Sequence, residues 1–243
     1  MLNTTQKRIA LWSGPRNIST AIMYSFAQRK DTRVYDEPLY AYYLSHSNAA
    51  SYHPGAQEVL QSQARDADEV IQMMLADHGK PVAFFKQMTH HLLDMDRSFL
   101  GQMHNVILTR NPKDMLLSFS KVIEHPQMQD VGYAAHIELL TFLQSMNCTP
   151  IVIDSAKLLQ NPERVLRTWC RLMDLEFDDA MLSWEAGPRP EDGVWAPYWY
   201  ASVHQSTGFG TYTPKNTALP DHLMPLYEEC LPLYNRLNEL AIE

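Results

Sequence analysis

Short, continuous apolar runs alternate along this chain with stretches of helical periodicity. The apolar runs predict buried strands over residues 8–13, 32–36, 82–86, 105–110 and 149–154. Apolar residues recur at helical spacing over 57–78, and further helices are predicted over 19–29, directly after 110, over 133–146 and over 162–174. Strands that are apolar on both faces and alternate with helices are typical of a parallel sheet covered on both sides. The predicted fold class is therefore α/β, a three-layer α/β/α arrangement with a central parallel sheet of about five strands.

The pattern changes after residue 186. Residues 187–218 are rich in Gly, Pro and aromatic side chains and show no helical period, which is typical of a functional lid or a disordered segment. The aromatic residues favour an ordered lid. A final helix is predicted over 220–241, bent near Pro225 and Pro232. Because there is no internal repeat, residues 1–243 are expected to form a single domain that includes this lid and helix.

The formal net charge of the chain is -8, which gives no overall attraction for nucleic acid or for an anionic membrane. Local Arg, Lys and backbone N–H groups must therefore hold any anionic ligand. No apolar run is long enough to span a bilayer, and the three cysteines show no CxxC spacing. The expected location is cytoplasmic, with no nucleic acid or membrane as a partner, and the sequence is compatible with a homodimer.

A first candidate anion site follows the first predicted strand. The segment from Ser13 to Thr20 reads Ser-Gly-Pro-Arg-Asn-Ile-Ser-Thr and leads into a helix, whose N-terminal N–H groups suit a phosphate or sulfate. The candidate ligand-binding residues are Arg16, Asn17, Ser19 and Thr20. The Gly-Lys-Ser/Thr of a Walker A loop is missing. The alternative is a helix capped by Ser or Thr after an ordinary loop.

A second candidate site follows the fourth predicted strand. Asn111 and Pro112 are explained by helix initiation, as N-cap and first helical residue. Helix initiation does not explain Arg110, because a charge at the end of an apolar strand needs an anionic partner. Ser118 lies about two turns into the helix, where a hydroxyl has no capping role. The alternative is an Arg110–carboxylate pair and a solvated serine.

Together the two segments resemble the sulfotransferase family, which uses 3′-phosphoadenosine 5′-phosphosulfate (PAPS). Arg16, Ser19 and Thr20 match the family's 5′-phosphosulfate loop, and Arg110 and Ser118 match its Arg-x-Pro-x-Asp-x-x-x-Ser segment for the 3′-phosphate. The resemblance covers roughly residues 8–175 and implies a P-loop NTPase-like fold. It implies PAPS as co-substrate, with Arg16 stabilising the leaving phosphate. A sulfuryl group carries less charge than a phosphoryl group, so no metal is required.

The sequence departs from the family pattern at three points. Ile18 stands where the family usually has Gly, and Ala21 replaces a Trp that stacks on adenine in the cytosolic members. Their late Arg-Lys-Gly nucleotide clamp is also absent. Residues 204–210 lie at a comparable place, and the candidates there for nucleotide contact are Ser206, Thr207 and Gly208.

The predicted general base is Glu37, which follows the second strand in a Glu-Pro dipeptide similar to that of carbohydrate-type and some bacterial sulfotransferases. Pro38 is expected to hold Glu37 in an extended conformation. The rival base is His90 or His91, near the position of the His in the Lys-Thr-His of cytosolic members. Lys86 matches the Lys of that motif and is expected to touch the transferring group. Surface or hydrogen-bonded side chains are the alternative for Glu37 and the histidines.

The predicted function is therefore sulfuryl transfer from PAPS to a hydroxyl or amine of a small-molecule or carbohydrate-like acceptor. Tyr40, Tyr42, Tyr43 and the lid aromatics either line its pocket or belong to the core. One alternative is a P-loop kinase-like enzyme with Asp154 as a Walker-B-like metal ligand. Another is a non-catalytic module that only binds PAPS or the product nucleotide.

Overall fold

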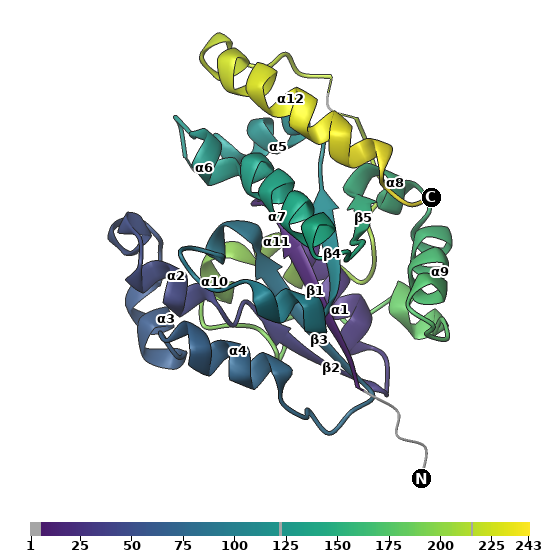
Figure 1. Cartoon of the computed structure of the whole chain (residues 1–243). Helices are drawn as coiled ribbons and strands as arrows, with labels where there is room; N and C mark the ends of the chain where they lie inside the picture. Colours follow the sequence, from purple (N-terminus) through teal and green to yellow (C-terminus); the bar gives the residue numbers. More distant parts are fainter. Residues whose placement is uncertain (1–5, 122, 215) are drawn as a thin grey trace.

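The computed structural model describes residues 6–121, 123–214 and 216–243, and a five-stranded parallel sheet forms its centre (Figure 1). The strand order is β2-β3-β1-β4-β5. The strands are β1 (Lys7–Ser13), β2 (Thr32–Asp36), β3 (Val82–Met88), β4 (His104–Thr109) and β5 (Ile151–Asp154). The apolar runs thus predicted each strand to within about two residues, the usual uncertainty of element ends.

Helices connect the strands and cover the sheet. The α-helices are α1 (Ser19–Ala27), α2 (Tyr40–Ser45), α3 (Ala56–Ser62), α4 (Ala67–Leu75), α5 (Pro112–Phe119), α6 (Met128–Val131), α7 (Tyr133–Ser145), α8 (Ser155–Gln160), α9 (Pro162–Leu172), α10 (Ala196–Trp199), α11 (Ala201–His204) and α12 (Met224–Glu239). Short 3₁₀ helices span Asn48–Ser51, Thr89–His91, Ser98–Gln102, Asp179–Leu182 and Asp221–Leu223.

The two faces of the sheet carry separate hydrophobic cores, because successive strand side chains point to opposite faces. In β1, Ile9 and Leu11 pack with α1, α8 and α9, whereas Ala10 and Trp12 pack with α4, α7 and α12. All four side chains are fully buried. The predicted three-layer α/β/α architecture is therefore confirmed, and it places the carboxyl ends of all strands at one edge.

The helix expected over 57–78 is in fact two helices, α3 and α4. Gln63 leaves the helical path because its side chain accepts from the Ala41 N–H at 3.1 Å and donates to the Glu37 carbonyl at 3.1 Å. Asp66 then caps α4 by accepting from the Glu69 N–H at 3.0 Å. This break ties the start of α2 to the turn after β2.

The described part of the segment expected to be a lid includes short helices. It contains α10 and α11, and its Trp195 and Tyr200 are buried in a small core shared with α2 and α3. The final helix begins at Met224 rather than at 220. Pro225 lies in its first turn, where a missing N–H costs nothing, so only Pro232 lies inside the helix.

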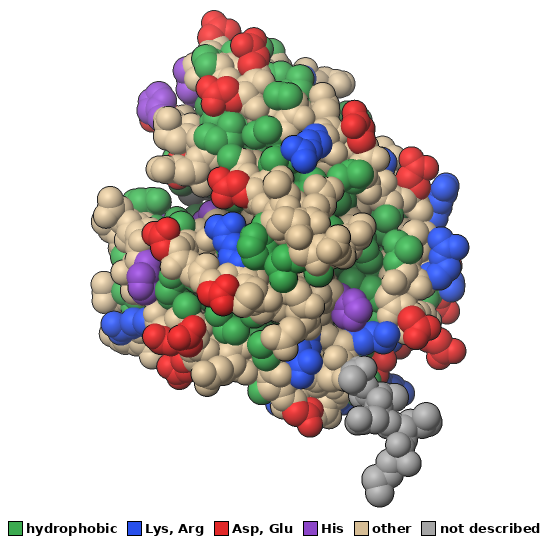
Figure 2. Space-filling view, in the orientation of Figure 1, with side chains coloured by type: hydrophobic (Ala, Val, Ile, Leu, Met, Phe, Trp, Pro, Cys, Tyr) green, Lys and Arg blue, Asp and Glu red, His purple; other side chains and the backbone are tan. Residues whose placement is uncertain are grey.

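The charge distribution on the surface and the length of the helices were compared with the sequence-based expectations. On the face shown in Figure 2, acidic and basic side chains are interspersed. Within residues 6–121, 123–214 and 216–243, no helix is both long and apolar enough to cross a membrane.

Candidate active site

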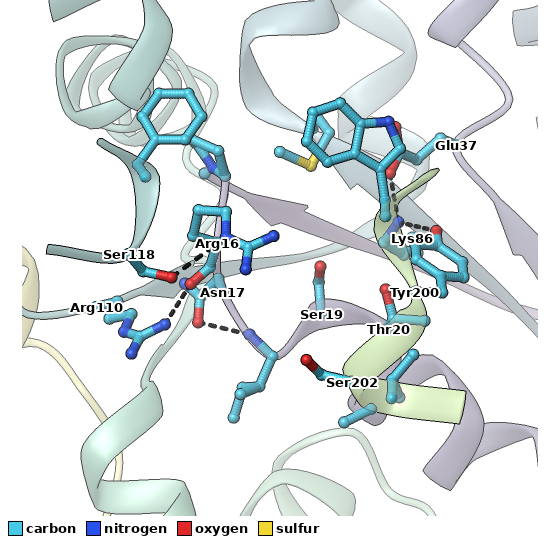
Figure 3. A pocket seen from close by; sticks show the side chains of 18 of the residues that line it. Arg16, Asn17, Ser19, Thr20, Glu37, Lys86, Arg110, Ser118, Tyr200 and Ser202 are labelled. Carbon is cyan, nitrogen blue, oxygen red and sulfur yellow. Dashed lines mark hydrogen bonds and ion pairs between the residues drawn. The ribbon is translucent and has the colours of Figure 1, made fainter. Parts of the chain in front are cut away.

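A cavity of about 920 Å³ lies where β1, β3 and β4 end (Figure 3). The chain passes from β1 to β2 and β3 on one side and continues to β4 and β5 on the other, so this edge is the topological switch point of the sheet. Open α/β sheets bind their ligands at that point. The residues that line the cavity come from both candidate anion segments, from the turn after β2 and from the segment around α10 and α11.

The turn after β1 presents an uncapped helix N-terminus to the cavity. Ile18 occupies the N-cap position of α1 without a side-chain hydrogen bond, so no side chain satisfies the first N–H groups of the helix. Ser19 and Thr20 follow and line the cavity. The Asn17 amide holds the turn, because it donates to the Leu108 carbonyl at 3.2 Å and accepts from the Ile18 N–H at 2.9 Å. Asn17 therefore fixes the shape of this turn.

Gly14 allows this turn to pass close to the start of α7. A Cβ atom at Gly14 would lie 2.9 Å from the Val131 carbonyl oxygen. Gly132 follows with φ 81° and separates α6 from α7. The Gly-Pro that ended the predicted first strand is thus a packing requirement of the site.

The two signatures meet in space, although they are about a hundred residues apart. Arg16, with φ 52°, donates from Nε to the Ser118 Oγ at 3.3 Å. Arg110 donates from a guanidinium nitrogen to the Arg16 carbonyl. Tyr133 holds the Arg110 carbonyl at 2.7 Å. The sequence-based prediction that Arg16, Arg110 and Ser118 belong to one site is consistent with this geometry (Figure 3).

The Arg110 guanidinium lacks full compensation for its burial. Burial lowers the pKa of Arg110 most, and the nearby Asp114 carboxylate opposes that effect. Among the described residues, Arg16 forms no ion pair with a carboxylate. Two partly buried guanidinium groups beside an uncapped helix N-terminus are therefore a candidate anion site.

On the opposite side of the cavity, Lys86 is the centre of a buried polar cluster. Its ammonium donates to Asp36 Oδ1 at 2.9 Å, to the Tyr200 hydroxyl at 2.7 Å and to a Glu37 oxygen. The Tyr200 hydroxyl donates to Asp36 Oδ2 at 2.7 Å and accepts from Trp195 Nε1 at 3.1 Å. An ammonium has three protons, and all three are used. In contrast to the sequence-based expectation, Lys86 has no proton left for a transferring group, and it holds Glu37 instead.

The backbone at Glu37 differs from the sequence-based expectation. Glu37 has φ 41°, in the left-handed region, rather than the extended conformation predicted from Pro38. Its N–H donates to the Lys86 carbonyl at 2.8 Å, and its carbonyl accepts from the Tyr40 N–H at 3.0 Å. These bonds outweigh the preference of a residue before proline. Strain of this kind costs about 1–3 kcal/mol and is concentrated at functional sites, which supports a role for Glu37.

Glu37 is nearly completely buried, yet it lines the cavity. Burial raises its pKa, Lys86 opposes the rise and Asp36 adds to it. A carboxylate with a raised pKa is a stronger base than an exposed one. Glu37 was predicted from the sequence, whereas its neighbours Asp36 and Tyr200 were not. Their only signals were a carboxylate beside Glu37 and an aromatic residue in the expected lid.

The rival bases are weaker. Burial lowers the pKa of His90 to about 3 and that of His91 well below its usual value. A neutral imidazole with so low a pKa accepts a proton poorly at neutral pH. His91 Nε2 lies 4.0 Å from Glu37 Oε2, so it packs beside the carboxylate. The geometry favours Glu37.

The segment over 204–210 approaches the cavity only in part. Ser206 and Gly208 line it, whereas Thr207 is exposed and lies outside the lining. The Ser206 hydroxyl donates to the Val203 carbonyl at 2.7 Å and accepts from Trp184 Nε1 at 3.0 Å. The structure thus brings two of the three predicted clamp residues to the cavity.

Asp154 does not have the position of a metal ligand in a kinase-like site. Its side chain caps α8 by accepting from the Ala156 and Lys157 N–H groups, and Tyr234 donates to its other oxygen at 3.0 Å. Asp154 is not among the lining residues of the cavity. In the described part of the chain, no group of three or more His, Cys, Asp or Glu side chains is placed to hold a metal ion.

We expect Lys86→Met to destabilise the protein by about 3–5 kcal/mol, because it leaves Asp36 and Glu37 buried without a cation. Loss of the Lys86 charge raises the pKa of Glu37 further. When a carboxyl has a higher pKa in the folded than in the unfolded protein, its contribution to folding stability falls as the pH rises. The fall begins at the unfolded pKa, ordinarily 4.5, and continues through the folded pKa. Urea denaturation should therefore show a larger deficit at about pH 8 than at about pH 5. The exposed Lys80→Met serves as control, and a deficit independent of pH would contradict this account.

Solved structures of sulfotransferases share this fold. Mouse sulfotransferase SULT7A1 complexed with PAP superimposes with a TM-score of 0.59, covering 98% of this chain and 90% of that chain at 11% sequence identity. A sulfotransferase from Alicyclobacillus acidocaldarius gives a TM-score of 0.56, covering 97% and 96% at 12% identity. At such low identity the likeness concerns the fold alone.

Curated relatives and a family model extend the comparison to sequence. Two Arabidopsis thaliana proteins, branched-chain-amino-acid aminotransferase-like proteins 2 and 1, are 38% and 39% identical over 232 and 228 residues. These matches cover 94% and 93% of this chain but 41% and 40% of the relatives, so the chain spans about two fifths of their length. The sulfotransferase domain model matches residues 7–241, and the chain therefore belongs to the sulfotransferase family.

Proposed function

We propose that this protein transfers a sulfuryl group from PAPS to a hydroxyl or amine of a small acceptor. The observation that carries the proposal is the meeting of two arginine-bearing turns in one cavity, opposite a buried carboxylate. A ligand with phosphate groups at two places matches two anion sites. The PAP-bound mouse sulfotransferase, which has the same fold, supports this nucleotide class.

In this proposal the two arginines have different roles. Arg110, with Ser118, binds the 3′-phosphate. Arg16, Ser19 and Thr20 at the start of α1 bind the 5′-phosphosulfate, where the helix N-terminus and the guanidinium stabilise negative charge on the leaving phosphate. Gly208 and Ser206 also line the cavity and are proposed to contact the nucleotide.

Glu37 is proposed to be the general base. It takes the proton from the acceptor hydroxyl or amine while the acceptor oxygen or nitrogen bonds to sulfur. The bond between sulfur and the bridging phosphate oxygen breaks, and adenosine 3′,5′-bisphosphate (PAP) leaves with both electrons. Lys86 keeps the Glu37 carboxylate in place and ionised before the reaction, since it favours the charged form.

The test is a calorimetric or thermal-shift titration with PAP, ADP and Mg·ATP, followed by measurement of PAP release from PAPS with a panel of alcohols, phenols and amines. Binding of PAP in preference to ADP, together with acceptor-dependent PAP release, would support sulfuryl transfer. Binding of Mg·ATP but not of PAP would reject it in favour of kinase-like chemistry. Tight PAP binding without turnover on any acceptor would indicate a binding module.

A further inference from the structure

The charged groups of the cavity are distributed unevenly. Among the described lining residues, the nucleotide side carries Arg16 and Arg110, and the other formal charges belong to Glu37, Lys86 and Asp130. The Lys86 charge is compensated within the buried cluster. Beyond the two arginines, the cavity therefore has an excess of negative charge.

Asp130 stands apart from the base cluster. It is the third residue of α6, and one of its oxygens accepts from the Gln127 N–H at 2.7 Å. No ion pair of Asp130 is formed with a described Lys, Arg or His. Asp130 is half-buried and lines the cavity.

Aromatic rings line the same cavity as Asp130. His53 lies 5.9 Å from Tyr43, 5.0 Å from Tyr52 and 6.3 Å from Trp199, measured between ring centroids, and all four residues line the cavity. Tyr52 is 53% exposed, which places part of its ring at the surface. Burial lowers the pKa of His53, and the Asp130 charge opposes this effect. Burial raises the pKa of Tyr43, and the Asp130 charge raises it further.

This part of the cavity holds no positive charge to receive an anion. Burial lowers the pKa of His53, His90 and His91, so all three imidazoles are neutral at pH 7. Within the described chain, the cation–π contacts are made elsewhere, by Lys86 on Tyr200, Arg167 on Phe177 and Arg189 on Tyr24. Within the described residues, no Lys or Arg lies over the rings around His53, and one face of Tyr43 is stacked on His91 at 4.7 Å between ring centroids.

We propose that Asp130 and the rings of Tyr43, Tyr52, His53 and Trp199, together called the aromatic cage, bind an ammonium group of the acceptor. Aromatic faces attract cations, and a carboxylate beside them adds a direct charge partner. The acceptor is then an amino alcohol or aminophenol, with its hydroxyl directed to Glu37, and anionic acceptors are excluded. The hydroxyl transfer in this statement rests on the proposed sulfotransferase function, whereas the ammonium site does not depend on it.

The test compares three probes that differ only in charge: phenethylammonium, 2-phenylethanol and phenylacetate. Each is titrated calorimetrically into the full chain, with and without PAP. We expect phenethylammonium to bind about tenfold more tightly than the neutral alcohol, and phenylacetate to bind most weakly. Equal affinities, or no phenethylammonium binding in the millimolar range, would overturn the proposal.

Variants of the protein test which residues cause the preference for the ammonium probe. Asp130→Asn keeps an oxygen for the Gln127 N–H but loses the charge, and should abolish most of the ammonium preference. Tyr52→Leu keeps apolar volume without a π face and should reduce it. Asp68→Asn, on an exposed position of α4, makes the same charge change away from the cavity and should leave binding unchanged. A preference that survives Asp130→Asn overturns the cage assignment.

The same experiment separates the two proposals. If PAP does not bind and the Asp130-dependent preference persists, the sulfotransferase mechanism fails and the ammonium site stands. If PAP binds and PAPS is turned over, but 4-hydroxyphenylacetate is sulfated as well as tyramine, the ammonium site fails and the sulfotransferase function stands.

Discussion

Glu37→Gln is expected to lower sulfuryl transfer by about 10²–10⁴-fold while leaving PAP affinity unchanged, because it removes the proton acceptor and little else. The amide has nearly the shape of the carboxylate, and its oxygen can still accept from the Lys86 ammonium. Glu37 lies on the opposite side of the cavity from the two arginines, so nucleotide binding should be intact. Single-turnover release of PAP, together with a PAP titration, measures both quantities.

The pH profile provides a second readout of the same role. Because burial raises the pKa of Glu37, the rate should rise with pH through a limb above the ordinary value of 4.5, since only the ionised carboxylate accepts a proton. That limb should be missing in Glu37→Gln. Glu69→Gln, on the exposed first turn of α4, is the matched control. Unchanged turnover in Glu37→Gln, with loss in His91→Asn, would transfer the role to the histidine.

The fold followed closely from the sequence because its strands are buried on both faces. A strand such as β1, with fully buried Ile9, Ala10, Leu11 and Trp12, appears as one continuous apolar run and needs no knowledge of its neighbours. The break between α3 and α4 was not predictable in this way. It depends on Gln63 bonds to backbone groups more than twenty residues earlier, which the local periodicity does not contain.

The residues of the candidate site were likewise predictable only where the local sequence carried a signal. Arg16 and Arg110 were recognisable because each lies in a turn that follows an apolar strand, and parallel strands bring their ends to one edge. The partnership of Lys86 with Asp36 and Tyr200 was not, because Tyr200 lies 164 positions from Asp36 in a segment without periodicity. With these partners, Lys86 is interpreted as a group that holds Glu37, the proposed base, and not as a group that contacts the sulfuryl.

Arg110→Ala is expected to weaken PAP binding roughly 10- to 100-fold, because it removes charge-assisted hydrogen bonds to the 3′-phosphate. For the unmodified protein, PAP at a hundred times its dissociation constant should stabilise the fold by about 2.7 kcal/mol. At the same PAP concentration the variant should lose about half of that gain if binding is tenfold weaker, and most of it if binding is 100-fold weaker. Arg171→Ala, at an exposed position of α9, removes the same charge from the surface and should keep the full thermal shift.

Comparison with 5′-AMP separates a lost phosphate contact from a damaged turn. Arg110 also donates to the Arg16 carbonyl, so its removal could disturb the neighbouring 5′ site. AMP has no 3′-phosphate, and its affinity should therefore be the same in the unmodified protein and in Arg110→Ala. An equal loss for AMP and PAP would mean that Arg110 only supports the turn at Arg16. An unchanged PAP affinity would place the 3′-phosphate elsewhere in the cavity, and with it the assignment of the second anion site would fail.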